Sequence, residues 1–183
     1  MTVQFLDLAA IPATRWKNGG GSTRELACWP PGAGMDGFGW RVSVATIAAP
    51  GPFSAFAGVD RQIMLLDGDG VYLRGSGWQH ALGERWQPFA FSGDEPVDCA
   101  MLGGTSTDFN LMLRRGAWRG QVQVLRQAPP AASAGLCMVL QGRWQGSRLL
   151  EPGQGFWWMQ GQGERIAPVN NESVLAWIAL EKI

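Results

Sequence analysis

The chain has 183 residues, enough for one generous domain or two small ones, and its formal net charge is zero. Zero net charge without any run of like charges argues against a nucleic-acid-binding protein, which needs a basic surface. Apolar residues make up 46%, enough for a real core, but no segment approaches the roughly 18 apolar residues of a membrane span, and the first ten residues lack the features of a signal peptide. We therefore expect a cytoplasmic protein without a membrane or nucleic-acid partner.

Predicted strands follow one another along the chain, and predicted helices are almost absent. Apolar and polar residues alternate in 40–45 (WRVSVA) and in 107–113 (TDFNLML), the period of half-buried strands. Asp67–Gly70 separates the apolar run IMLL from VYLR and predicts a tight β-hairpin. Turn formers recur about every 8–12 residues, which favours an all-β sandwich or barrel. A single helical turn around Pro52–Phe56 is the most helix that we expect.

A weak internal repeat runs through these strands. Met64–Gly68 (MLLDG) matches Met138–Gly142 (MVLQG), and each copy continues with a short strand, a glycine-bearing turn, an aromatic strand and an apolar strand. These last two segments lie at 88–91 and 97–102 in the first copy, and at 155–158 and 173–180 in the second. Two copies of one β-unit predict two small barrels packed together.

The boundary between the two barrels is predicted from composition. Residues 128–132 (APPAA) form a connector of proline and alanine, which is typical of a linker. We therefore expect a first half at residues 1–127, which carries the pocket, and a smaller second half at residues 128–183.

The chain offers few residues for a metal or a covalent mechanism. Its one histidine, His80, sits in a glycine-flanked segment (GSGWQHALG), and we expect it to be an exposed loop residue. Metal sites in β-barrel enzymes of this size commonly use two or three histidines with a carboxylate, so we expect neither metal nor cofactor. Cys28, Cys99 and Cys137 lie far apart in apolar runs, which predicts buried thiols.

The segment 15–23 (RWKNGGGST) has two interpretations. It is not a Walker A loop, because Lys17 precedes the glycines instead of following them. Three successive glycines nevertheless permit several backbone N–H groups to converge, while Lys17, Asn18 and Thr23 add a charge, an amide and a hydroxyl. The segment either holds a small anion or carboxylate, or forms a wide turn with no ligand.

Arg61 is a second candidate for an anion site, because its forked guanidinium suits a carboxylate. The preceding residue, Asp60, either orients Arg61 or pairs with it at the surface.

Two predicted strands in which polar and apolar residues alternate provide a third candidate site. Asp108 and Asn110 share one face of a predicted strand, and Arg41 and Ser43 share one face of another. These side chains line a pocket if the face points inward, and they are solvated if it points outward.

Five segments carry a resemblance to a known family. They are 15–26 (RWKNGGGSTREL), 40–45 (WRVSVA), 51–61 (GPFSAFAGVDR), 65–70 (LLDGDG) and 108–112 (DFNLM). In this order and spacing they resemble the HutD/Ves family of bacterial cupin-like proteins, whereas the remainder matches only as a generic second cupin half. The resemblance implies an all-β bicupin with two cupin-like barrel or jelly-roll halves, very little helix and no metal. It also implies an association with histidine utilisation, and a binding or regulatory role more than a proven enzymatic one.

The resemblance also implies a set of ligand-binding residues. The polar residues of the family correspond to Trp16, Lys17, Asn18, Thr23, Glu25, Arg41, Asp60, Arg61, Asp108 and Asn110. With Gly19, Gly20 and Gly21 they would form one concave pocket in the first barrel. We expect the backbone amides of the glycine run and Lys17 to approach a small anion from one side, and Arg61 to approach it from another.

Three functions remain open at this stage. The first is binding of a carboxylate metabolite, with N-formylglutamate or urocanate as candidates from the family's association. The second is a metal-free isomerase or hydrolase with Glu25 or Asp108 as general base, and Lys17 or Arg61 on the developing charge. The third is an interaction module or homodimer, in which tryptophans form the partner surface. The tryptophans considered for that surface are Trp78, Trp86, Trp118, Trp144, Trp157 and Trp158.

Overall fold

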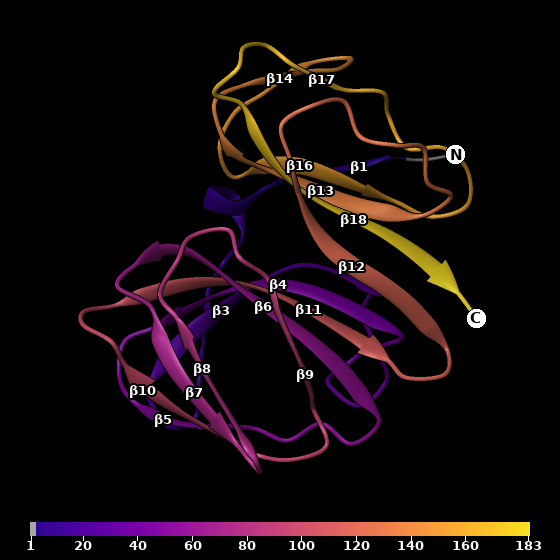
Figure 1. Cartoon of the computed structure of the whole chain (residues 1–183). Helices are drawn as coiled ribbons and strands as arrows, with labels where there is room; N and C mark the ends of the chain where they lie inside the picture. The colour runs from indigo at the N-terminus through magenta and orange to yellow at the C-terminus, as the bar shows by residue number, and fades with distance from the viewer. Residues whose placement is uncertain (1–2) are drawn as a thin grey trace. The chain divides into compact units, whose positions relative to one another are not determined.

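The chain folds almost entirely into β-strands, which confirms the all-β prediction. The computed structural model describes residues 3–183 and contains eighteen strands, and the one helix in this range is the 3-10 helix η1 (Leu8–Ala10) (Figure 1). The helical turn expected around Pro52–Phe56 is wrong, because β5 (Gly51–Phe53) is extended and a loop follows it. Within residues 3–183 no helix has the length and apolarity that a membrane span requires.

The described chain divides into two compact units. One unit is Pro12–Ala117, and the other combines Trp118–Ile183 with the N-terminal segment that ends at Ile11. This division differs from the predicted boundary after residue 127. The reason is strand pairing: β1 (Gln4–Asp7) pairs with β16 (Gln154–Trp158), and β12 (Trp118–Leu125) pairs with β18 (Val174–Lys182).

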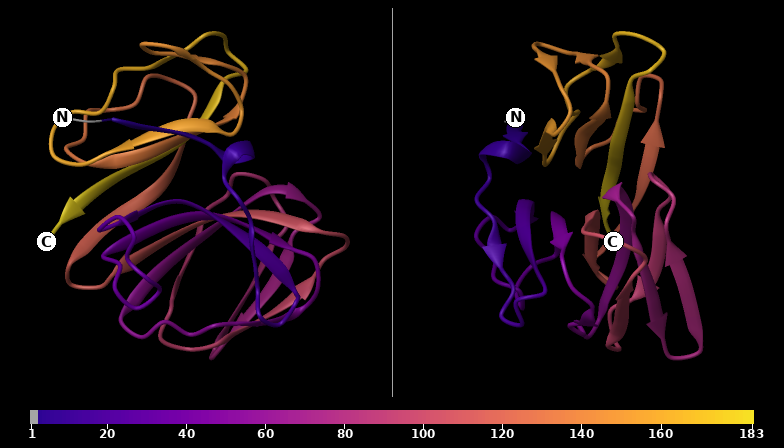
Figure 2. Two further views of the ribbon diagram at one scale, coloured as in Figure 1. Left: turned by 180° about the vertical axis from the view of Figure 1, so that it is seen from behind. Right: turned by 90° about the vertical axis from the view of Figure 1, so that its left-hand side faces the viewer.

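The unit Pro12–Ala117 contains a six-stranded sheet in the order β2-β3-β4-β11-β6-β9 and a four-stranded sheet in the order β5-β10-β7-β8. Every strand pair in them is antiparallel. Figure 2 shows these strands from two further directions. The strands not yet placed are β2 (Thr14–Arg15), β3 (Gly21–Trp29), β4 (Trp40–Ile47), β6 (Val59–Gly68), β7 (Val71–Gly75), β8 (Trp78–Leu82), β9 (Phe89–Ser92), β10 (Val97–Met101) and β11 (Ser106–Arg114).

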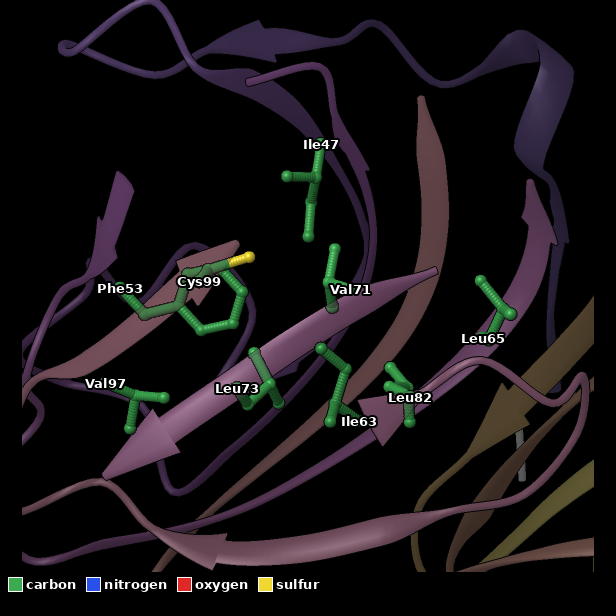
Figure 3. Packing of buried hydrophobic residues seen from close by; sticks show 9 residues of the cluster. All are labelled: Ile47, Phe53, Ile63, Leu65, Val71, Leu73, Leu82, Val97 and Cys99. Carbon is green, nitrogen blue, oxygen red and sulfur yellow. The ribbon is translucent and has the colours of Figure 1, made fainter. Parts of the chain in front are cut away.

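Apolar side chains from both sheets meet inside this unit and form its core (Figure 3). The six-stranded sheet contributes Ile47, Ile63 and Leu65, all buried. The remaining members of the cluster are Phe53, Val71, Leu73, Leu82, Val97 and Cys99, which lie on the strands of the other sheet. Burial of this apolar surface is the main contribution that holds the two sheets together.

The two faces of the six-stranded sheet differ in polarity. Trp40, Val42 and Val44 on β4 lie opposite Leu113, Leu111 and Phe109 on β11, and all six are buried. Their neighbours Arg41, Ser43 and Ala45 lie opposite Met112, Asn110 and Asp108 on the other face. That second face is the one that carries Ile47 and Ile63 into the core, so the polar side chains of β4 and β11 point into the unit.

The turn at Asp67–Gly70 exists, but the predicted hairpin is wrong. β6 belongs to the six-stranded sheet, whereas β7 belongs to the four-stranded sheet and pairs with β8 and β10. The turn is therefore a corner between sheets. Gly68 and Gly70 have φ of +92° and +88°, and a Cβ atom on either would lie about 2 Å from a backbone oxygen.

Strand order supports the internal repeat and corrects its last member. In the first unit β11 pairs with β4 and β6, and β6 also pairs with β9; in the second, β18 pairs with β12 and β13 (Gly135–Gln141), and β13 also pairs with β16. The segment 88–91 therefore corresponds to 155–158 as predicted. The strand that corresponds to 173–180, however, is β11, and not the segment 97–102.

Aromatic side chains fill the interior of the second unit. It contains a five-stranded sheet, β1-β16-β13-β18-β12, and a three-stranded sheet of β14 (Trp144–Gln145), β15 (Leu149–Leu150) and β17 (Ala167–Pro168). Trp144, Phe156, Trp158 and Trp177 are at most 2% exposed within one apolar cluster. Three of the tryptophans considered for a partner surface are therefore buried in the chain: Trp144, Trp158 and Trp118, which is 7% exposed.

Candidate functional site

A cavity of about 610 Å³ opens within the unit Pro12–Ala117, on the polar face of the six-stranded sheet. Ile47, Phe53 and Ile63 line it and also belong to the apolar core, so the cavity borders directly on that core. Its other lining residues are Thr14, Arg15, Trp16, Lys17, Asn18, Thr23, Glu25, Met35, Arg41, Ser43, Ala45, Pro52, Ser54, Phe56, Arg61, Asn110 and Met112.

Arg61 lines the cavity from β6 with its hydrogen-bonding capacity largely unused. Its Nη1 donates to the carbonyl oxygen of Ser54 at 3.4 Å, and its Nε is buried without a hydrogen-bond partner among residues 3–183. The guanidinium carbon lies 5.6, 5.5 and 4.9 Å from the ring centres of Phe53, Phe56 and Phe91. Burial, with a smaller contribution from the charge of Arg41, lowers the pKa of Arg61 to about 10. It remains a cation at neutral pH, one whose charge no carboxylate of the described chain neutralises.

Arg41, in contrast, is already paired. Its Nε donates to Oε2 of Glu25 at 2.7 Å, and its Nη1 lies 3.4 Å from the hydroxyl of Ser43. The Arg41 side chain is 13% exposed and the Glu25 side chain 42%. Glu25 and Ser43 are cross-strand partners between β3 and β4, so sheet register brings the carboxylate to the guanidinium.

The glycine run does not present converging amides to the cavity, contrary to our expectation. The Gly19 amide donates to the carbonyl oxygen of Trp16 at 3.0 Å, and the Gly20 amide donates to Oδ1 of Asn18 at 2.9 Å. None of Gly19, Gly20 and Gly21 lines the cavity. The run is a turn that places the side chains of the residues before it.

Trp16, Lys17 and Asn18 reach the cavity because of this turn. The Trp16 indole donates from Nε1 to Oγ1 of Thr23 at 2.8 Å, and its ring packs edge-on against Phe53 with centres 6.3 Å apart. A Cβ atom on Gly21 would lie 2.4 Å from the carbonyl oxygen of Thr46 and 3.1 Å from the Trp16 ring. Only glycine at this position leaves room for the indole in its place.

Besides the three glycines, two predicted site residues, Asp60 and Asp108, do not line the cavity. Asp60 points to the surface, where its Oδ1 accepts from Nε of Arg115 at 2.8 Å, because consecutive residues of β6 face opposite sides. Asp108 is fully buried next to the core and does not line the cavity. Its Oδ2 accepts from the Ser106 hydroxyl at 3.0 Å, while Oδ1 has no hydrogen-bond partner among residues 3–183. Burial raises the pKa of Asp108 to about 7, although the hydrogen bond from Ser106 lowers it.

Sequence reasoning missed the apolar walls and part of the rim. Phe53, Ser54 and Phe56 lie in the segment GPFSAF that supported the family resemblance, yet we had assigned them no role. Arg15 lies in the glycine-run segment, and its charge was the signal that could have found it. Met35 comes from the loop between β3 and β4, which carries no local signal for a site.

The charges around the cavity are mostly positive. Arg15, Lys17, Arg41 and Arg61 line it, with Glu25 as the one carboxylate in the lining. Such a lining attracts an anion, and the aromatic and aliphatic side chains of the same cavity suit an apolar part of the same molecule.

The residues that we considered for other chemistry lie elsewhere. His80 is half-buried on β8 and stacks on Phe89 with ring centres 3.8 Å apart, so the expectation of an exposed loop residue is wrong. Cys28, Cys99 and Cys137 are free and buried, as predicted. Across residues 3–183 no group of three or more His, Cys, Asp or Glu side chains is arranged to hold a metal ion.

Known proteins match most of this chain. The family described as HutD matches residues 8–176. The chain belongs to the HutD family. Protein Ves from Cronobacter sakazakii is 43% identical over 164 residues, which covers 87% of this chain and 88% of that protein.

Solved structures match this HutD-family chain over its whole length. A conserved protein of unknown function from Pseudomonas aeruginosa PAO1 is 32% identical, with a TM-score of 0.87 over 99% of this chain and 100% of that one. HutD from Pseudomonas fluorescens SBW25, in a structure described as a formate condition, is 28% identical with a TM-score of 0.86 and full coverage of both chains. Protein Ylba from E. coli shares the fold at 11% identity, with a TM-score of 0.75 over 100% of this chain and 91% of that one. The fold is all-β and cupin-like.

Proposed function

We propose that this HutD-family protein binds a small carboxylate metabolite in the cavity of the unit Pro12–Ala117, in the cytoplasm and without a metal. The observation that carries the proposal is the state of Arg61. Its guanidinium is partly stripped of water, retains its charge and lacks a carboxylate partner among residues 3–183. A buried cation without a counter-ion is unfavourable, and a bound carboxylate would remove that penalty with charge-assisted hydrogen bonds.

The charges that line the cavity support binding of one carboxylate group in its interior, next to Arg61. Glu25 already neutralises Arg41, so Arg61 is the partly buried cation that remains for a ligand. Arg15 and Lys17 are exposed at the rim, where water screens their interaction with any second anionic group.

The family points to a class of ligand and to a role. HutD-family proteins are associated with histidine utilisation, and N-formylglutamate and urocanate are the carboxylates that we propose to test first. The formate condition of the Pseudomonas fluorescens HutD structure names the smallest carboxylate. A protein that binds such a metabolite without consuming it would regulate histidine catabolism.

Calorimetric titration tests the proposal. Wild-type protein is titrated with N-formylglutamate, urocanate and formate, and the series is repeated with Arg61→Ala. Loss of the cation should weaken binding at least ~30-fold, as expected for a buried charged contact. Arg119→Ala is the matched control, because Arg119 forms an exposed ion pair with Glu181 in the other unit and should have no effect. Failure of all three acids to bind would refute the proposal.

A second candidate function is a metal-free isomerase or hydrolase. Asp108 favours it, because a buried carboxyl group with a pKa raised to about 7 has the acidity of a general acid or base at neutral pH. Against it, Asp108 does not line the cavity, and Glu25 is engaged by Arg41. Turnover of urocanate or N-formylglutamate that is abolished in Asp108→Asn or Glu25→Gln would favour the enzyme over the binding protein.

A further inference from the structure

Two loops that lie beside the end of β11 border the cavity. The loop 30–39 joins β3 to β4 and contributes Met35 to the lining. The loop 54–58 joins β5 to β6 and contributes Ser54 and Phe56. Both loops therefore supply apolar side chains to the lining, Met35 from one and Phe56 from the other, and the Phe56 ring lies 5.5 Å from the guanidinium carbon of Arg61.

One side chain is hydrogen-bonded to both loops. Arg114, the last residue of β11, donates from Nη1 to the carbonyl oxygen of Ala57 at 3.1 Å and from Nη2 to the carbonyl oxygen of Asp36 at 3.2 Å. Its guanidinium carbon also lies 5.4 Å from the ring centre of Phe38. Arg114 itself does not line the cavity.

The backbone at Arg114 and Arg115 is also hydrogen-bonded to both loops. The amide of Arg114 donates to the carbonyl oxygen of Gly39 at 2.7 Å, and the amide of Arg115 donates to that of Gly58 at 2.9 Å. Between the loops lies a small apolar cluster, with Phe38, Val59 and Met112 buried and Ala33 and Phe56 packed against them. The end of β11 is thus the point at which the two loops are joined.

We propose that Arg114 is a positioning residue for the cavity: its guanidinium holds the loops 30–39 and 54–58 together, and so keeps Met35 and Phe56 in place against the apolar part of a ligand. The inference rests on the proposed carboxylate-binding function. A guanidinium is suited to this role, because its rigid fork of five N–H donors can bind two carbonyl groups in fixed directions at once. A lysine ammonium at the same position would hold them less firmly.

The role makes a prediction about ligand size. Formate is small enough to be held by Arg61 alone, whereas benzoate also places a flat apolar ring against the loop side chains. Arg114→Met should therefore weaken benzoate binding about 10-fold, the cost of ordering two or three loop side chains on binding, and formate binding less than about two-fold. Arg114→Lys should fall between Arg114→Met and wild type. A purely structural defect would weaken the two acids equally.

The experiment combines calorimetry with amide hydrogen exchange on the ligand-free protein. In Arg114→Met the amides of Gly37 and Gly58, which are hydrogen-bonded to the Gly34 carbonyl and to Asp94, should exchange at least ~10-fold faster than in wild type. Arg119→Met, the matched control, should leave both exchange rates and both affinities unchanged. If Arg114→Met does not fold, Arg114→Lys serves for the same comparison.

The outcomes separate the two proposals. Faster exchange in both loops with selective loss of benzoate affinity supports the role of Arg114. Unchanged exchange, or equal weakening of benzoate and formate, overturns it. If wild-type protein binds neither acid, the carboxylate-binding function fails, and the exchange rates alone decide whether Arg114 orders the loops.

Discussion

Arg41 and Arg61 lie in one row of the six-stranded sheet, one on each side of Met112. Met112 is the cross-strand partner of Arg41 on β4 and of Arg61 on β6, and all three side chains line the cavity. Two strand spacings separate the two arginines, about 10 Å between their backbones. Glu25 neutralises Arg41, and the unneutralised Arg61 is the position at which an anion gains most.

Removing the carboxylate of Glu25 should strengthen anion binding. In Glu25→Gln the cavity loses its one acidic side chain, and Arg41 becomes free to attract the ligand. At this range a charge in a partly solvated site contributes about 0.5–1 kcal/mol, so affinity for N-formylglutamate or formate should rise roughly two- to five-fold. Calorimetry measures the change. Asp60→Asn, which also removes a carboxylate paired to an arginine but outside the cavity, should leave affinity unchanged, and weaker binding in Glu25→Gln would contradict the charge assignment.

Asp108 should make the protein less stable as pH rises from about 4 to 7. Its folded pKa of about 7 lies above the ordinary value of 3.8, so in this range the folded state binds more protons than the unfolded state. The stability contributed by Asp108 is fully present below the unfolded pKa, falls as pH rises and reaches its minimum above pH 7. The rise in pKa from 3.8 to about 7 corresponds to roughly 4 kcal/mol.

Asp108→Asn isolates this contribution, because the amide is neutral at every pH. Urea unfolding of both proteins at pH 4 and pH 8 should show similar stability at pH 4 and a more stable variant at pH 8. The same difference between variant and wild type at both values would show that Asp108 does not titrate in this range.

Gly21→Ala should disturb the site through the backbone. The new Cβ atom would lie 2.4 Å from the Thr46 carbonyl oxygen, so β3 or β4 must shift and the Trp16 ring must move with it. We expect a loss of roughly 1–3 kcal/mol in the free energy of unfolding and weaker carboxylate binding. Gly34→Ala is the control, since nothing lies within 4 Å of its Cβ position and its φ is not positive. Equal stability of the two variants would contradict the packing described for Gly21.

The three cysteines should be unreactive in the folded protein. Cys28, Cys99 and Cys137 are buried, and burial is the largest cause that raises the pKa of each, to about 12 for Cys99. Thiolate is the reactive form, so a disulfide reagent at pH 8 should label none of them within minutes and all three after unfolding in urea. Rapid labelling of a native thiol would place that cysteine at the surface.

Alternation along single strands was enough to predict part of the cavity. Arg41 and Asn110 were found because polar and apolar residues alternate on β4 and β11, but the sequence could not say which face points inward. The same alternation should have separated Asp60 from Arg61, since adjacent residues of a strand face opposite sides. The family resemblance brought both into the expected site, and the ion pair of Asp60 with Arg115 shows why only Arg61 belongs there.

Contacts between segments far apart in the chain could not be predicted from the sequence. The turn residues Asp67–Gly70 are as suitable for a corner between two sheets as for a hairpin, and the choice depends on β10 and β11, far along the chain. Met35 and Phe56 likewise reach the cavity from loops, and Arg114, far along the chain, contributes hydrogen bonds to both of those loops. No local pattern predicts such contacts.

A crystal structure with a bound carboxylate tests the central claim most directly. Crystals of the wild-type protein are soaked with formate, N-formylglutamate or urocanate, and Arg61→Ala crystals are treated in parallel. We predict carboxylate oxygens within hydrogen-bonding distance of the Arg61 guanidinium in the wild-type cavity and no such density in the variant. A carboxylate bound away from Arg61, or bound equally in Arg61→Ala, would contradict the assignment of this cavity as an anion site.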